Sequence, residues 1–220
     1  MLNKTAKVKI CGLMGENDVK MCVCHGADII GFVVDYPRPV PWNLSAQAAK
    51  KLAAIVSRPS ESCVVTGGSP DKIIKLVSEI QPDYVQLHGG ETLADTARII
   101  DALCKCGVRV IKTVFPDAPG LERSAADFCE AGVYALLFDP RTPDNATASG
   151  TADINTFIKL KNAVSCPVIL AGGINPWNAA EIIQKTGAKI IDLMTGVEKA
   201  PGIKDEEKVK LLLKNTKGGQ

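Results

Sequence analysis

Short apolar runs alternate with amphipathic stretches along the whole chain. We predict strands at residues 7–11, 29–34, 62–65, 84–87, 109–113, 135–138, 168–170 and 190–193. Helical patterns lie between them, at residues 17–25, 46–56, 70–80, 92–105, 121–131, 154–163, 176–185 and 206–215. Most strand segments are continuous apolar runs, which is typical of parallel strands covered on both faces. The pattern therefore predicts an α/β fold built from right-handed crossover units.

The number of these units distinguishes two α/β architectures. Eight such units in a chain of 220 residues favour a closed (β/α)8 TIM barrel. The alternative, an open doubly wound sheet, usually has a G-x-G-x-x-G turn after its first strand. Here that turn reads CGLMG, and glycines gather instead after the seventh and eighth predicted strands. We predict one barrel domain over residues 1–220, with residues 217–220 as a frayed tail.

The composition excludes several classes of partner. The net charge is +2, and basic residues are scattered among acidic ones, so we expect no binding to nucleic acid. No apolar stretch approaches the ~18 residues of a membrane span, and residues 1–8 lack the apolar region of a signal peptide. We therefore expect a cytoplasmic protein that does not associate with membranes.

The chain has 8 cysteines, which we interpret as reduced thiols because a chain of this length without an export signal is expected in a reducing compartment. Cys22 and Cys24 form one C-x-C pair, and Cys104 and Cys106 form another. Neither pair has the C-x₂-C spacing of a structural zinc site, so core or surface thiols are the preferred interpretation. We predict neither a metal nor a cofactor.

The two glycine-containing loops near the C-terminus are the strongest local signal. Gly172 and Gly173 lead directly into the predicted seventh helix, and Thr195 and Gly196 follow the eighth predicted strand. Loops after strands seven and eight are the usual phosphate site of a barrel, because glycines allow several backbone N–H groups to converge on an oxyanion. The alternative is that these glycines only form turns. We predict phosphate binding.

Two further strand ends carry groups that can transfer protons. Cys11 ends the first predicted strand, and Asp139 follows the sixth. A thiolate can accept a proton and a carboxylic acid can donate one, provided that the site tunes their pKa values. Alone, a cysteine at a strand end is more often a buried filler, and an aspartate there often caps a turn.

Polar residues at other strand ends are candidates for substrate contact. Gln86 and His88 are two residues apart, so they lie on the same side of the fourth strand. We predict that both face the substrate, although each can equally serve as a hydrogen-bonded structural group. Lys112, at the end of the fifth predicted strand, is a candidate Schiff-base lysine or, more simply, a charge at the barrel mouth.

Several motifs occur in the order known from one enzyme family. "KICGL", "VQLHGGE", "LLFDPRTP", "LAGGINPWNAAEII" and "TGVEKAPGIKDEEKVKLLLKN" resemble phosphoribosylanthranilate isomerase of tryptophan biosynthesis. The resemblance implies an Amadori rearrangement of N-(5-phosphoribosyl)anthranilate to the 1-deoxyribulose 5-phosphate aminoketose, without cofactor or metal. It further implies that Cys11 is the general base and Asp139 the general acid. The matching phosphate contacts are Gly172, Gly173, Thr195 and Gly196.

The chain also departs from the family pattern at the end that faces the anthranilate. The family has serine-x-arginine after the second-strand Tyr-Pro, and that arginine is expected to face the anthranilate carboxylate. Here Arg38 follows Pro37 directly, and we assign Arg38 to substrate binding from this different backbone position; the alternative is that the partner of the carboxylate is lost. A family diglycine followed by Phe-Asp-Trp is replaced by "TASGTADINTF", and Gly67-Gly68 adds a candidate oxyanion contact.

Three hypotheses therefore remain. The first is a divergent phosphoribosylanthranilate isomerase. The second is a related barrel isomerase, epimerase or lyase that acts on another phosphosugar. The third is a non-catalytic phosphosugar-binding relative. Retention of Cys11 and Asp139 favours the first two over the third. The oligomeric state, monomer or homodimer, is open.

Overall fold

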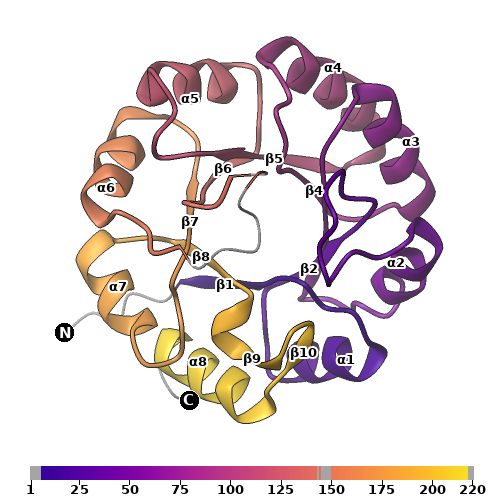
Figure 1. Ribbon diagram of the computed structural model, residues 1–220, viewed down its shortest axis with the longest axis vertical. Helices are drawn as coiled ribbons and strands as arrows, with labels where there is room; N and C mark the ends of the chain where they lie inside the picture. Colours follow the sequence, from indigo (N-terminus) through magenta and orange to yellow (C-terminus); the bar gives the residue numbers. More distant parts are fainter. Residues whose placement is uncertain (1–5, 143, 145–149, 218–220) are drawn as a thin grey trace.

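The computed structural model describes residues 6–142, 144 and 150–217. Parallel strands form a closed barrel in the order β1 to β8, and β8 pairs with β1 to complete it. The helices surround the barrel as an outer ring (Figure 1). The strands are β1 (Lys7–Ile10), β2 (Ile29–Val33), β3 (Glu61–Thr66), β4 (Tyr84–Leu87), β5 (Arg109–Val114), β6 (Ala135–Phe138), β7 (Val168–Ala171) and β8 (Ile190–Leu193). The predicted (β/α)8 fold is confirmed.

The helices agree with the predicted segments, with differences mainly at their ends. They are α1 (Glu16–Cys24), α2 (Ala46–Ala53), α3 (Pro70–Ile80), α4 (Leu93–Leu103), α5 (Leu121–Glu130), α6 (Ile154–Ala163), α7 (Ala179–Thr186) and α8 (Glu206–Lys217). Short 3₁₀ turns, η1 (Cys104–Cys106) and η3 (Thr195–Val197), and a small hairpin of β9 (Glu198–Ala200) and β10 (Ile203–Lys204) were not expected. Helix α8 includes Lys217, whose ammonium pairs with Asp28 at 2.8 Å, and residues 218–220 of the predicted tail lie outside the described residues.

The start of α7 corrects a prediction that bears on the site. The helix begins at Ala179, three residues after the predicted start at residue 176. The cause is Asn175, whose side-chain oxygen accepts the backbone N–H groups of Trp177 at 3.0 Å and Asn178 at 3.2 Å. This local turn competes with helical hydrogen bonding, as asparagine side chains often do. Gly172 and Gly173 therefore do not lead directly into the helix.

Alternation along the strands divides the core into two apolar layers. Val8 and Ile10 of β1 belong to the layer between barrel and helices, whereas Cys11 belongs to the barrel interior. The same alternation places Ile111 of β5 inside. Successive side chains of a strand point to opposite faces, so the residues on either side of Ile111 point outward, toward the helices.

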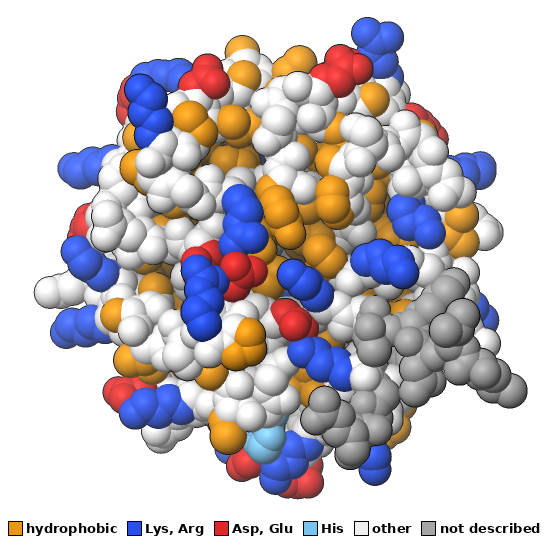
Figure 2. Space-filling view, turned by 180° about the vertical axis from the view of Figure 1, so that it is seen from behind, with side chains coloured by type: hydrophobic (Ala, Val, Ile, Leu, Met, Phe, Trp, Pro, Cys, Tyr) orange, Lys and Arg blue, Asp and Glu red, His pale blue; other side chains and the backbone are white. Residues whose placement is uncertain are grey.

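The amino ends of the strands carry a network of charged and aromatic side chains. Glu61 accepts hydrogen bonds from Arg58 at 2.8 Å, Arg109 at 2.6 Å and the Tyr84 hydroxyl at 2.7 Å. The Arg109 guanidinium also lies 3.8 Å from the centre of the Tyr84 ring. Figure 2, which shows the face opposite to that of Figure 1, has acidic and basic side chains adjacent to one another near its middle. This network covers the end of the barrel away from the carboxyl ends of the strands.

The cysteines contradict the prediction of reduced thiols at one pair. Cys129 in α5 forms a disulfide with Cys166, which lies just before β7. The alternation of β and α segments brings the end of one helix beside the start of a later strand, so their Cα atoms lie 5.6 Å apart. Cys22 is buried, whereas Cys24, Cys104 and Cys106 are exposed, and no group of three or more potential metal ligands occurs among the described residues.

The disulfide is expected to contribute measurably to stability. It closes a segment of 37 residues, and the chain-entropy model gives about 3–4 kcal/mol for a loop of this length. A Cys129→Ser/Cys166→Ser variant is therefore expected to lower the free energy of unfolding by about that amount in urea titrations. Cys104→Ser, at an exposed thiol, is the control. An unchanged midpoint in the double variant would contradict the prediction.

Within the described part of the chain, no helix is long and apolar enough to cross a membrane.

Candidate active site

Two adjoining cavities open at the carboxyl ends of the strands. The first has a volume of about 460 Å³ and is lined by Cys11, Val33, Tyr36, Val40, Trp42, Val65, Gln86, His88, Asp139, Arg141, Asp192 and Met194. The second has a volume of about 550 Å³ and is lined by Arg141, Gly150, Thr151, Gly172, Gly173, Ile174, Asp192, Leu193, Met194, Thr195 and Gly196. We call them the apolar cavity and the glycine cavity. Arg141, Asp192 and Met194 line both, so the two cavities adjoin at these side chains.

Cys11 lies directly after β1 and faces the apolar cavity. Its backbone N–H donates to the carbonyl of Leu193 at 3.0 Å, and Gly31 of β2 leaves space for its side chain, since a Cβ at Gly31 would lie 2.9 Å from the sulfur. Burial raises the pKa of the thiol, whereas the nearby Lys9 ammonium opposes this rise. Lys9 itself forms a buried ion pair with Asp192 at 2.9 Å. The thiol thus has a fixed cation beside it.

Lys9 keeps its positive charge inside the barrel. Burial alone would lower its pKa, but the charge and hydrogen bond of Asp192, the largest opposing influence, help to raise the pKa overall. Lys9 and Cys11 both point inward, because they are two residues apart and the extended chain of β1 continues to Cys11. A positive charge at this place favours the thiolate form of Cys11 over the thiol.

Asp139 follows β6 and is held by one arginine. Its Oδ1 accepts the backbone N–H and the Nε–H of Arg141, both at 2.9 Å, and its Oδ2 accepts from Nη2 at 2.8 Å. Burial would raise the pKa of this carboxyl, but the hydrogen bonds and charge of Arg141 outweigh burial and lower it. Asp139 is therefore ionised at neutral pH in this structure.

His88 and Gln86 both line the apolar cavity, on the same side of the strand as expected. The Gln86 amide nitrogen lies 3.3 Å from His88 Nδ1, and the Thr113 hydroxyl lies 3.2 Å from the same atom. An amide nitrogen can only donate, so Nδ1 accepts and the ring proton is on Nε2. Burial lowers the pKa of His88, which agrees with a neutral ring. The Gln86 Oε1 is buried without a hydrogen-bond partner among the described residues.

Backbone from the ends of β7 and β8 forms the glycine cavity. Gly172 and Gly173 have φ angles of 99° and 70°, which residues with side chains rarely adopt. A Cβ at Gly196 would lie 2.1 Å from the carbonyl oxygen of Ile174, so only glycine fits there. The predicted phosphate residues Gly172, Gly173, Thr195 and Gly196 are thus brought together in one cavity.

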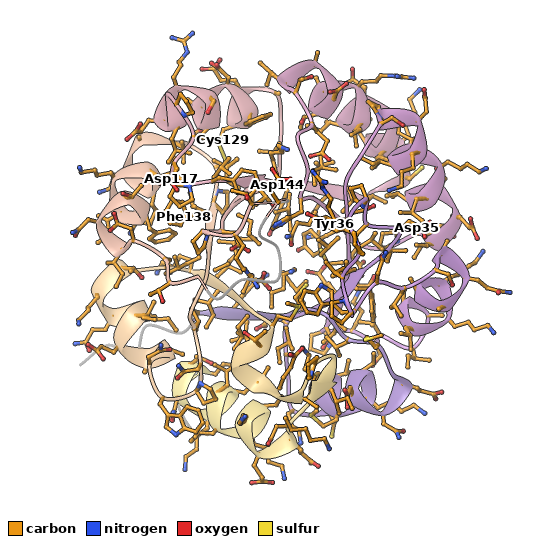
Figure 3. The ribbon with its side chains drawn as sticks, in the orientation of Figure 1. Asp35, Tyr36, Asp117, Cys129, Phe138 and Asp144 are labelled. Atoms are coloured by element: carbon orange, nitrogen blue, oxygen red, sulfur yellow. A yellow bond between two sulfur atoms is a disulfide. The ribbon has the colours of Figure 1, made fainter. Side chains whose placement is uncertain are left out.

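Two predicted candidates lie outside both cavities. Arg38 is exposed and pairs with Asp144 at 2.5 Å. Tyr36, which precedes Arg38 on the same loop, and Asp144 both lie on the inner side of the ring of helices (Figure 3). Lys112 points outward from β5, where its ammonium pairs with Glu91 at 2.7 Å, so it does not lie at the barrel mouth.

Gly67 and Gly68, the candidate oxyanion contact after β3, bind to other parts of the protein instead. The N–H of Gly68 donates to the carboxylate of Glu91 at 3.1 Å. The carbonyl of Gly67 accepts from the Lys72 ammonium at 2.7 Å. Neither glycine lines the described cavities. The oxyanion contact expected at this loop is therefore replaced by an internal carboxylate.

Sequence reasoning missed several residues that line the cavities. Arg141 and Asp192 line both, and Tyr36 and Trp42 line the apolar one. Asp192 was open to prediction, since it lies in an apolar strand two residues before Met194 and therefore on the same side. Trp42 and Arg141 lie on loops, where the two-residue alternation of a strand does not predict which side chains face a cavity.

Comparison with known proteins identifies the relatives of the chain. Residues 8–215 match the family model described as N-(5'phosphoribosyl)anthranilate (PRA) isomerase. An N-(5'-phosphoribosyl)anthranilate isomerase of Caulobacter sp. (strain K31) is 34% identical over 208 residues, which cover 90% of this chain and 92% of the relative.

Solved structures give the same result. A phosphoribosyl anthranilate isomerase in complex with reduced 1-(o-carboxyphenylamino)-1-deoxyribulose 5-phosphate has a TM-score of 0.80 and 28% identity, covering 97% of this chain and 99% of the other. Monomers of the dimeric phosphoribosylanthranilate isomerase from Thermotoga maritima have a TM-score of 0.77 and 28% identity, with the same coverage.

Proposed function

The chain belongs to the family of N-(5'-phosphoribosyl)anthranilate isomerases of tryptophan biosynthesis, and we propose that Cys11 and Asp139 carry out the isomerisation at the apolar cavity. One observation carries this assignment. A thiol that follows β1 and a carboxyl that follows β6 line one cavity, which adjoins a second cavity built from glycine backbone. Such an arrangement suits a phosphorylated sugar with its reacting carbons between an acid and a base.

The chemistry requires one proton donor and one proton acceptor. Asp139, as the acid, gives a proton to the furanose ring oxygen while the bond from this oxygen to C1 breaks and the nitrogen lone pair forms a C1=N bond. The Cys11 thiolate then removes the proton on C2, and the C–H electrons form a C1=C2 bond and neutralise the nitrogen. The resulting enol becomes the C2 ketone as C1 takes a proton from solvent and the C2 hydroxyl releases its proton to solvent. No atom is gained or lost, as an isomerisation requires.

The two cavities suit the two ends of this substrate. We place the phosphate in the glycine cavity, against backbone at Gly173 and Gly196. The aromatic ring then lies in the apolar cavity beside Tyr36 and Trp42. The unpartnered Oε1 of Gln86 is suited to accept a hydrogen bond from a substrate N–H or O–H group.

Complementation separates this function from its rivals. We expect the chain to restore growth of a tryptophan auxotroph that lacks the isomerase. Failure by well-folded protein would contradict the assignment and favour another phosphosugar isomerase, epimerase or lyase. A non-catalytic relative would bind the phosphosugar without forming product. The retained acid and base favour catalysis.

Inorganic phosphate is expected to protect the fold through the glycine cavity. A ligand that binds only the folded state adds about 2.7 kcal/mol at 100 times its dissociation constant, so millimolar phosphate is expected to raise the melting temperature. Sodium chloride at matched ionic strength is the control. Gly196→Ala, whose Cβ would meet the Ile174 carbonyl, is expected to lose the effect. No shift in the unmodified protein would exclude a phosphate site there.

The assembly and location complete the proposal. We propose a cytoplasmic enzyme that is a monomer or a homodimer; the Thermotoga maritima relative is described as dimeric. Sedimentation equilibrium distinguishes the two states.

A further inference from the structure

The contact between Asp139 and Arg141 joins two charged side chains that both line the apolar cavity. Three N–H groups of one residue hold both oxygens of the carboxylate. The Arg141 side chain is 17% exposed and the Asp139 side chain 2%. Water therefore screens the attraction between their charges only little. A paired guanidinium and carboxylate of this geometry is specific as well as strong.

Arg141 is also the one lysine or arginine, among the described residues, that lines either cavity. The other charged side chains there are the carboxylates of Asp139 and Asp192, and His88 is neutral. The substrate of the proposed function carries two anionic groups, a phosphate and a carboxylate. The phosphate has the backbone of the glycine cavity available to it, whereas the carboxylate has no described cation except Arg141, since Arg38 lies outside.

The same contact conflicts with the role proposed for Asp139. A general acid must carry a proton when the substrate reacts. While Arg141 remains on the carboxylate, Asp139 stays ionised because all of its strong partners favour the charged form. Arg141 must therefore loosen its contact before Asp139 can donate a proton.

We propose that Arg141 binds the carboxylate of the substrate's anthranilate ring, and that its departure from Asp139 prepares Asp139 to act as the general acid. This inference rests on the proposed function and adds to it a residue that determines specificity. The chemistry of the substrate makes the exchange feasible. Five bonds separate the ring oxygen, which Asp139 protonates, from the carboxylate carbon ortho to the nitrogen. A guanidinium that already lies on Asp139 is thus within reach of this carboxylate.

The proton count is conserved through this exchange. In the structure without substrate, the buried Cys11 is a thiol and Asp139 a carboxylate, so the pair holds one proton. When the Arg141 side chain leaves Asp139, the proton affinity of the Asp139 carboxylate rises, while Lys9 continues to favour the thiolate of Cys11. The single proton moves from Cys11 to Asp139, which creates the base and the acid together. After the reaction steps the pair again holds one proton, on Cys11.

Ligand pairs that differ only in the carboxylate test the proposal. We would measure, by calorimetry, the binding of reduced 1-(o-carboxyphenylamino)-1-deoxyribulose 5-phosphate and of the same compound without the carboxylate. Arg141→Met is expected to weaken binding of the first about 10- to 100-fold, the loss typical of one charge-assisted contact, and to change binding of the second less than about threefold. Arg141→Lys is expected to recover part of the affinity, since lysine keeps the charge but not the fork.

A second variant tests the exchange itself. In Asp139→Asn, Arg141 no longer has to leave a carboxylate, so the carboxylated ligand is expected to bind several-fold more tightly than to the unmodified protein while turnover is lost. A merely structural role of Arg141 predicts no such gain. Unchanged or weaker binding of the carboxylated ligand to Asp139→Asn would count against the exchange.

The outcomes separate this inference from the proposed function. If the unmodified protein forms product but Arg141→Met loses both ligands equally, Arg141 contacts the phosphate or only supports the fold, and the inference is wrong. The same holds if Arg38→Ala, rather than Arg141→Met, removes the preference for the carboxylate. If the unmodified protein forms no product and shows no preference between the ligands, the proposed function fails and the inference fails with it.

Discussion

Replacement of Cys11 by serine is expected to lower kcat by about 10²- to 10⁴-fold, the usual contribution of a general base. A serine hydroxyl is nearly isosteric with the thiol, but it does not ionise near neutral pH, even beside the Lys9 ammonium. The substrate contacts proposed for the glycine cavity and the aromatic side chains remain. The dissociation constant for the reduced product analogue is therefore expected to change little. Steady-state turnover and calorimetry measure the two quantities separately.

The exposed Cys104 provides the matched control for this substitution. Cys104→Ser makes the same atomic change far from the cavities, and we expect it to leave kcat unaltered. Full activity in Cys11→Ser would remove Cys11 from the mechanism. A parallel loss of ligand binding would indicate that the substitution disturbs the site rather than the proton transfer.

Replacement of Lys112 by methionine is expected to destabilise the fold by about 3–5 kcal/mol, the cost of leaving a buried partner charge without its counterion. Lys112 and Glu91 have side chains that are 4% and 0% exposed, and they pair at 2.7 Å. Glu91 also accepts the N–H groups of Gly68 and Gly89, each at 3.1 Å. The glutamate would thus remain fixed in the interior with one cation missing. Urea unfolding measures the loss.

Two comparisons isolate the cause of this loss. Lys112→Met/Glu91→Gln removes both charges and is expected to be more stable than Lys112→Met alone. Lys185→Met breaks an exposed helical pair with Glu181, and its unfolding midpoint is expected to stay almost unchanged. Equal midpoints for Lys112→Met and Lys185→Met would show that burial of the Lys112–Glu91 pair contributes little.

The periodic part of the sequence predicted the fold and much of the site. Continuous apolar strands alternating with amphipathic helices have few packing solutions, and the barrel is the one observed. Alternation along β4 placed Gln86 and His88 on one side, and both line the apolar cavity. The same rule applied to β5 would have turned Lys112 outward, because Ile111 points inward. The prediction for Lys112 was wrong because its position at a strand end was considered without its side.

The remaining features depend on the conformation of loops or on contacts between distant segments, which one sequence does not reveal. Arg141 was visible in the motif "LLFDPRTP", but its contact with both oxygens of Asp139 is a property of the loop. The delayed start of α7 follows from the Asn175 side chain competing with the helix. The Cys129–Cys166 disulfide joins residues from different crossover units, so no local spacing signals it.

The positions of the two tryptophans give the protein an internal optical probe. Trp42 is 8% exposed in the wall of the apolar cavity, whereas Trp177 is 69% exposed on the turn before α7. The chain contains no other tryptophan. In a Trp177→Phe variant, all of the tryptophan emission would therefore come from the wall beside the proposed anthranilate site. Occupancy of that wall by an aromatic ligand could then be followed in real time, without labels, during a single turnover.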